Sequence, residues 1–133
     1  MNRRHRLSGR RAFAAVRAQR ISSTSGPIRV HVAGNDRGLA RAGFSIPKTV
    51  GGAVQRNRVR RRLRALLAPR LQALGAVDLV IAVLPAAGSL DTAALADHLE
   101  HALGSALSVL SVRVSVGARG GGATTLAPRP QPA

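Results

Sequence analysis

The pattern of hydrophobic and polar positions changes period along this chain, and each period predicts a different element. Apolar residues at helical spacing predict a short helix over about 9–20, with Ser8 as its N-cap. The Ser-rich stretch 21–27 predicts a loop. Residues 28–32 alternate between apolar and polar side chains, which predicts a half-buried strand, and Gly, Asn and Asp predict a turn over 34–38.

Residues 39–46 predict the return strand of a hairpin, which Pro47 ends because proline removes a backbone donor from a sheet. A helix is then predicted over about 53–68, where Val and Leu recur at i, i+4, i+7 and i+8 and form an apolar stripe. Pro69 disfavours continuation of this helix, and Gly75 closes the segment.

The second half of the chain is mainly apolar. Residues 77–84 are almost continuously hydrophobic, which is typical of a central strand. Asp91 can cap a third helix, whose leucines share one face as far as Leu110. Alternating valines predict a last short strand over 112–116, and the aperiodic Gly, Pro, Ala and Thr of 117–133 predict a disordered tail.

These elements predict an α+β fold in a single domain, residues 1–116, with helices on one side of one sheet. Its core should be aliphatic, because the chain has two Phe and no Tyr or Trp. The absence of Cys excludes disulfides and thiol catalysis. No apolar run has the length of a signal peptide or a membrane span, so we expect a soluble cytoplasmic protein.

Charge is distributed very unevenly. The net charge is +16, and residues 1–70 hold 18 basic residues against one acid (net +17), whereas residues 71–133 hold three against four (net −1). Six arginines and one asparagine occupy seven of the nine positions 56–64, with no acid among them. Such a density of like charge indicates a polyanionic partner.

On a helical wheel the apolar stripe of the 53–68 helix faces away from a polar arc that could bind phosphates, formed by Asn57, Arg58, Arg60, Arg61 and Arg64. Arg62 lies at the flank, and Arg56 falls near the apolar side, so it should leave through the first turn. Because aromatic platforms are almost absent, we expect backbone and shape recognition of structured RNA. Phe13 and, more weakly, His31 are the candidates for stacking, although Phe13 fits a core position equally well.

The residues argue against a protein-centred active site. The pair His98 and His101 is the only one near a metal-ligand spacing, and solvated polar positions explain it. The sequence has no nucleophile elbow, no phosphate-binding glycine loop with its lysine and no carboxylate dyad. Gly51-Gly52 before a helix could present amides to a phosphate, and a strand-to-helix turn explains the pair equally well.

The stretch 43–64 resembles the signature of the protein subunit of bacterial ribonuclease P, with Gly-x-Ala-Val-x before an Arg-Asn-Arg core and basic residues after it. Arg6-Leu7 with Phe13-x-x-Val16 resembles the N-terminal helix of that family, and 75–81 resembles its Gly-x-x-Asp-hydrophobic strand. The resemblance covers about residues 3–110. It implies a small α/β sandwich of the ribosomal protein S5 domain 2 type, with one mixed sheet packed by helices, the order α-β-β-β-α-β-α and a left-handed βαβ crossover.

The resemblance also implies a function. A catalytic RNA with Mg²⁺ at its own active site would remove the 5′ leader of precursor tRNA, and this chain would be an accessory subunit, one per RNA, with no membrane partner. The catalytic RNA would be bound by Lys48, Arg56, Asn57, Arg58, Arg60, Arg61 and Arg64. A leader cleft between the first helix and the sheet would be lined by Phe13, Val16, Arg17 and His31.

The chain departs from the family pattern at Pro47, Thr49, Gly52 and Ala65, where the family has a small polar residue, a second lysine, an asparagine and a glutamate. We expect these departures to change contacts at the 47–52 loop and to weaken the affinity for the leader. Two other functions use the same residues. One is a structural rRNA-binding protein, which fold alone does not separate from the first. The other is a module for membrane surfaces or nucleoids, which is disfavoured because the core needs the apolar stripe.

Overall fold

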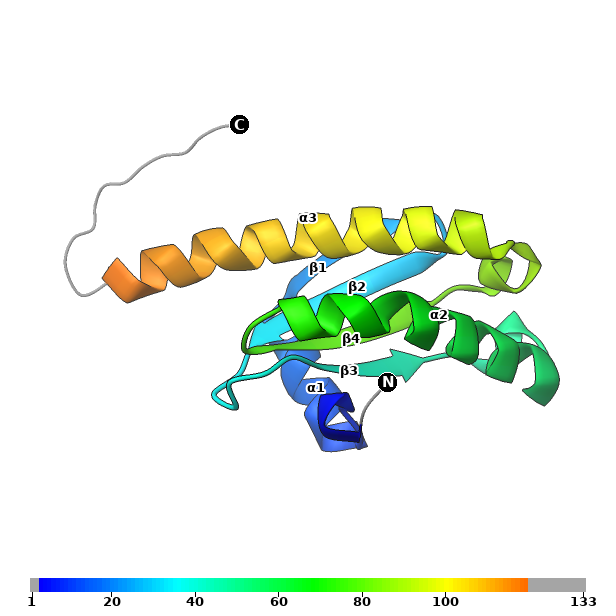
Figure 1. Ribbon diagram of the computed structural model, residues 1–133, viewed down its shortest axis with the longest axis horizontal. Coiled ribbons are helices and arrows are strands. Elements are labelled where there is room, and N and C mark those ends of the chain that lie inside the picture. Colours follow the sequence, from blue (N-terminus) through cyan, green and yellow to red (C-terminus); the bar gives the residue numbers. More distant parts are fainter. Residues whose placement is uncertain (1–2, 120–133) are drawn as a thin grey trace.

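The structure is a computed structural model that describes residues 3–119, with the side chains of residues 3–112. Three helices pack on a four-stranded sheet of order β1-β2-β4-β3 (Figure 1). The elements are α1 (Arg10–Ala18), β1 (Ile21–Ser25), β2 (Ile28–Gly34), β3 (Arg41–Ser45), α2 (Ala53–Ala73), β4 (Val77–Val83) and α3 (Thr92–Arg119), with short 3-10 turns η1 (Arg3–His5), η2 (Lys48–Val50) and η3 (Pro85–Ser89). The α+β class and the order α-β-β-β-α-β-α are confirmed.

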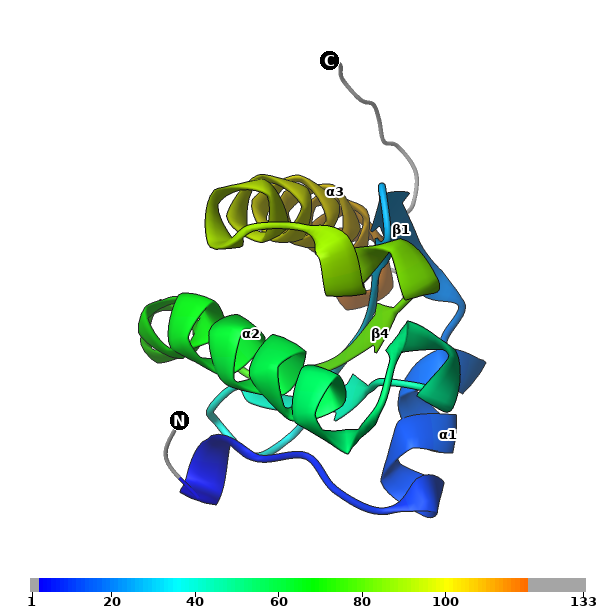
Figure 2. The same ribbon diagram turned by 90° about the vertical axis from the view of Figure 1, so that its right-hand side faces the viewer.

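Helices cover both faces of the sheet, so the prediction of helices on one side was wrong. In Figure 2, α2 and α3 lie on one face and α1 on the other. The larger core lies under α2 and α3, where residues such as Leu63 and Leu99 pack against Val30 and Ile81. A smaller cluster under α1 contains Leu7, Val16, Ala33 and Val80. The two clusters use opposite faces of the same strands, as period-2 alternation requires.

The Ser-rich stretch that was predicted to be a loop forms the edge strand β1. It pairs antiparallel with β2 from Ile21 opposite Val32 to Ser25 opposite Ile28. The turn between them is tight, and Gly26 has φ 54°, which glycine adopts without a Cβ penalty. A Gly-Pro pair between two short β-compatible runs was the signal that the sequence analysis missed.

The predicted hairpin between residues 28–32 and 39–46 is also wrong. β4 lies between β2 and β3, antiparallel to the first and parallel to the second. β4 is more hydrophobic than β3 and buries both of its faces, so it takes the central position. The β3–α2–β4 connection has the uncommon left-handed sense that the resemblance implied (Figures 1 and 2).

Three helix ends differ from prediction, namely the start of α1, the end of α2 and the end of α3. Gly9, not Ser8, occupies the N-cap position of α1, without a side-chain hydrogen bond. α2 continues through Pro69 to Ala73. Asp91 caps α3 as predicted, accepting from the Ala94 N–H at 2.8 Å. The expected strand over 112–116 and the first residues of the expected tail fall within α3, and 120–133 lie outside the described residues.

Candidate nucleic-acid interface

α2 separates its leucines from its arginines, as the wheel predicted. Val59, Leu63, Leu67 and Leu71 are at most 2% exposed, so the apolar stripe is part of the core and is not available to a lipid surface. Burial of each such side chain stabilises the fold by about 1.5–3 kcal/mol. On the opposite side the most exposed members of the predicted set form a ridge: Asn57, Arg58 and Arg61.

The remaining arginines between positions 56 and 64 are half-buried and point in three directions. Arg56 donates from Nε to the Gly51 carbonyl at 3.2 Å, so it does leave through the first turn. Arg62 donates to the Leu90 carbonyl at 3.2 Å, which ties α2 to the segment before α3. Arg60 and Arg64 turn toward the N-terminal segment. Lys48, in η2 just before α2, is exposed at the edge of the same surface.

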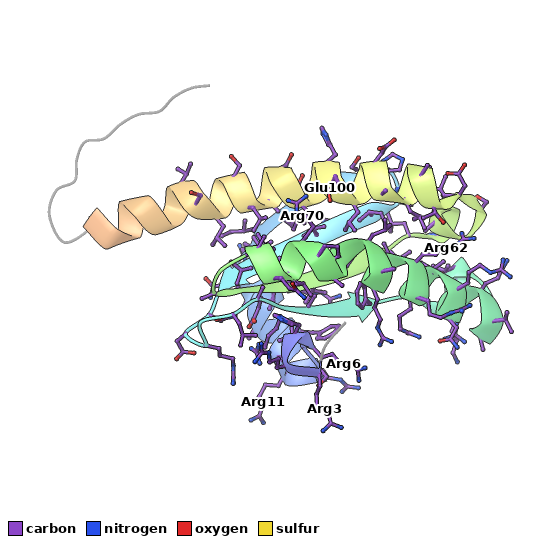
Figure 3. The ribbon with its side chains drawn as sticks, viewed as in Figure 1. Arg3, Arg6, Arg11, Arg62, Arg70 and Glu100 are labelled. Carbon is purple, nitrogen blue, oxygen red and sulfur yellow. The ribbon has the colours of Figure 1, made fainter. Side chains whose placement is uncertain are left out.

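The N-terminal segment adds basic residues that the sequence analysis did not assign to the interface. Arg6 forms a parallel bridge with Ala42 at the outer edge of β3, and the Leu7 N–H donates to the Ala42 carbonyl at 2.9 Å. His5 Nδ1 lies 2.7 Å from the Ala40 carbonyl oxygen. Figure 3 shows the side chains of Arg3, Arg6 and Arg11 around η1 and α1. The run of arginines near the N-terminus was the available signal, but its docking on β3 was not readable from sequence.

A pocket of about 300 Å³ lies where this segment, β3 and α2 meet. Arg6, Arg60 and Arg64 line it, together with Phe13 and Phe44. Burial, followed by the charges of Arg6 and Arg60, lowers the pKa of Arg64 from its ordinary value. The pocket is therefore a concentrated positive site.

The four residues predicted to line a leader cleft do not all meet. Val16 is 2% exposed and packs under α1, and Phe13 packs against the same cluster and reaches the pocket at the β3 edge. His31 is half-buried on the α1 side of the sheet, beside Val80. Burial, then Arg17 and Arg29, lowers the pKa of His31. The charge of Arg17 therefore acts on His31 on this face of the sheet.

The sheet beyond α1 is open and polar on the same face as His31. The row of cross-strand neighbours there is Thr24, Arg29, Ala82 and Ser45, of which Thr24 and Arg29 are exposed. Together with Arg17 and His31 they form a basic face on which an extended strand of nucleic acid could lie.

Other polar features have structural roles. His98 Nδ1 lies 2.9 Å from the Ser25 hydroxyl, and its ring packs on Gly26, so it fixes the β1–β2 turn to α3. Arg70 and Glu100 form an ion pair between α2 and α3, facing each other in Figure 3. Within the described part of the chain, no group of three His, Cys, Asp or Glu residues could hold a metal ion. Nor does any described helix have the length and apolarity needed to cross a membrane.

The fold and this surface define a small α+β protein with an arginine-rich face for a polyanion. The family model for ribonuclease P matches residues 1–107. The ribonuclease P protein component of Streptomyces bikiniensis is 44% identical over 109 residues, covering 74% of this chain and 89% of that protein. The component of Acidothermus cellulolyticus is 38% identical over 104 residues, covering 76% and 87%. The chain belongs to the ribonuclease P protein family.

Solved structures agree on the fold. The ribonuclease P protein of Staphylococcus aureus superposes with a TM-score of 0.67 at 22% identity, covering 74% of this chain and 92% of that one. The protein from Thermotoga maritima gives 0.63 at 18% identity, covering 72% and 94%. The same backbone thus accommodates widely different sequences.

Proposed function

We propose that this chain is the accessory protein subunit of a ribonuclease P ribonucleoprotein. It binds the catalytic RNA and the 5′ leader of precursor tRNA, and it promotes removal of the leader. The observation that carries the proposal is the division of α2 into a buried leucine side and an arginine side without any acid. Guanidinium groups match phosphate oxygens in charge and geometry, so this side suits an RNA backbone.

The catalytic RNA would lie along the ridge of α2 and reach Lys48 at one end. The leader would lie on the basic sheet face beside Arg17 and His31. Phe13 and Val16 would support that face from beneath α1 rather than contact RNA along its whole length, because Val16 is almost fully buried. Few stacking contacts fit a subunit that recognises backbone and shape.

Catalysis would belong to the RNA. Mg²⁺ bound at the RNA active site would supply the Lewis acid and activate the attacking water. The protein would neutralise phosphate charge where the two RNAs approach, which lowers the Mg²⁺ concentration that the complex needs. We propose one protein per RNA, acting in the cytoplasm and not at a membrane.

Reconstitution tests this function. The protein is combined with a bacterial ribonuclease P RNA at low Mg²⁺, and cleavage of precursor tRNA is measured with and without it. We expect cleavage at the mature 5′ end to accelerate at least tenfold. Binding of the RNA with no acceleration at any Mg²⁺ concentration would contradict the proposal and favour a structural rRNA-binding protein.

A further inference from the structure

The pocket at the β3 edge has two kinds of wall. Both phenylalanines of the chain, Phe13 and Phe44, line it, and so do Arg6, Arg60 and Arg64. None of the described residues that line it is acidic. A site with aromatic surface beside three unneutralised guanidiniums has the chemistry of a nucleotide site, in which phosphate and base occupy adjacent positions.

No acidic residue among the described lining residues neutralises the three guanidinium groups of the pocket. Arg64 Nε is buried and has no hydrogen-bond partner among the described residues. A buried donor left without an acceptor costs free energy, and the neighbouring charges of Arg6 and Arg60 add repulsion. An anion in the pocket would relieve the repulsion and give this guanidinium an acceptor.

Contacts within the chain hold the walls of the pocket in place. A Cβ on Gly43 would lie 2.4 Å from Phe13 Cζ and 2.6 Å from the Leu7 carbonyl oxygen, so the phenylalanine ring and the N-terminal segment both press on this glycine. The hydrogen bond from Leu7 to Ala42 fixes the segment that carries Arg6. The pocket is therefore largely preformed.

We propose that this pocket binds one unpaired nucleotide of RNA, with its phosphate on Arg6, Arg60 and Arg64 and its base against Phe13 and Phe44. The inference rests on the proposed function and adds to it Arg6, Phe44 and a defined subsite. A volume of about 300 Å³ is at the lower end for ligand pockets, so it admits a single nucleotide and excludes a base pair.

Nuclear magnetic resonance tests the site directly, because the chain has only two phenylalanine rings to observe. A short single-stranded oligoribonucleotide should shift both phenylalanine rings and the Arg64 Nε–H resonance. Inorganic phosphate should shift the Arg64 resonance and leave the rings nearly unchanged. A nucleoside monophosphate should shift the same three signals at a higher concentration, and unmoved rings in the presence of bound oligoribonucleotide would overturn the proposal.

A matched pair of variants tests the same site in the complex. Arg6→Gln removes a pocket charge from an exposed side chain, and Arg37→Gln removes the same charge from the exposed 34–38 turn. We expect Arg6→Gln to raise Kd for the catalytic RNA or precursor tRNA about tenfold, and Arg37→Gln to change it less than about twofold.

The two proposals fail in different ways. Equal effects of both variants, in a protein that still accelerates leader cleavage, would overturn the nucleotide pocket and leave the proposed function intact. Absence of any acceleration by the unaltered protein would overturn the proposed function itself.

Discussion

At the scale of single residues, Gly43 shows how one position links the sheet to the pocket. Alanine there would place its Cβ 2.4 Å from the Phe13 ring and 2.6 Å from a backbone oxygen. Because the backbone cannot yield cheaply, Gly43→Ala should lower the free energy of unfolding by about 1–3 kcal/mol.

Urea denaturation measures this change, with Gly34→Ala as the matched control. Gly34 lies in the same sheet, and a Cβ there would meet nothing within 4 Å. Equal stability of the two variants would show that Phe13 is not packed on β3 as described.

A second prediction at the residue scale concerns His31 and the pH dependence of stability. Its pKa is lowered by burial and by Arg17 and Arg29, so the unfolded chain binds a proton at a higher pH than the folded protein. The stability that neutral His31 contributes is complete above the unfolded pKa of about 6.5 and is lost as pH falls below that value. We expect His31→Gln to flatten the fall in stability between about pH 7.5 and 5.5.

The control for this measurement is His101→Gln, since His101 is exposed on α3. Ring proton titration by nuclear magnetic resonance gives the pKa of His31 itself. A bound leader should raise that pKa, because phosphate charge favours the imidazolium. A His31 pKa above about 6.5 in the free protein would contradict the prediction.

At the scale of elements, the sequence predicted the helices and strands whose hydrophobic pattern matches the faces that they bury. β4 is a continuous apolar run and became the central strand, and α2 and α3 each carry one apolar stripe. β1 was missed because its serines give no hydrophobic signal, and its strand state depends on pairing with β2. The parallel partnership of β3 with β4 was not predictable from periodicity, because pairing is set by the crossover of α2 and not by local pattern.

Pro69 is an exception to the predicted helix boundaries, because α2 continues through it. Proline inside a helix costs about 3 kcal/mol, since it removes a backbone hydrogen bond and crowds the preceding turn. One further turn buries Leu71 and places Arg70 against Glu100, and tertiary packing of this kind offsets the cost.

Pro69→Ala should therefore raise the free energy of unfolding by about 1–3 kcal/mol, because alanine restores the donor and keeps the packing. Pro69 is exposed, so no core contact is lost. The control is Pro85→Ala at the first position of η3, where proline is tolerated and little change is expected. Unchanged or lower stability of Pro69→Ala would show that the last turn of α2 depends on proline geometry.

At the scale of the whole molecule, the two halves of the chain have different roles, one in the basic surface and one in the core. The acid-poor first half supplies α1, the N-terminal segment and the arginines of α2, and the nearly neutral second half supplies β4 and α3, which complete the larger core. Composition alone indicated this division. It did not indicate that the N-terminal segment docks on β3 beside α2, which joins two basic stretches, far apart in sequence, around one pocket.

The basic surface around α2 predicts a specific dependence of RNA affinity on salt concentration. Each phosphate contact that the protein makes contributes about 0.7 to 0.9 to the slope of log affinity against log salt concentration. Arg58 and Arg61 are exposed on the ridge and have no acidic neighbour on α2, so both are free to contact phosphates. Replacing both with alanine should reduce the slope by about 1.5 and weaken binding of the catalytic RNA by about 2–3 kcal/mol at low salt.

The matched control removes two exposed arginines away from α2, in Arg20→Ala with Arg37→Ala. It changes the net charge equally, so a general effect of charge would lower both slopes alike. A larger loss for the ridge variant means that the RNA follows α2, whereas equal losses would mean that the excess charge attracts RNA without a defined surface. The salt titration therefore distinguishes a defined RNA interface on α2 from attraction of RNA by net charge alone.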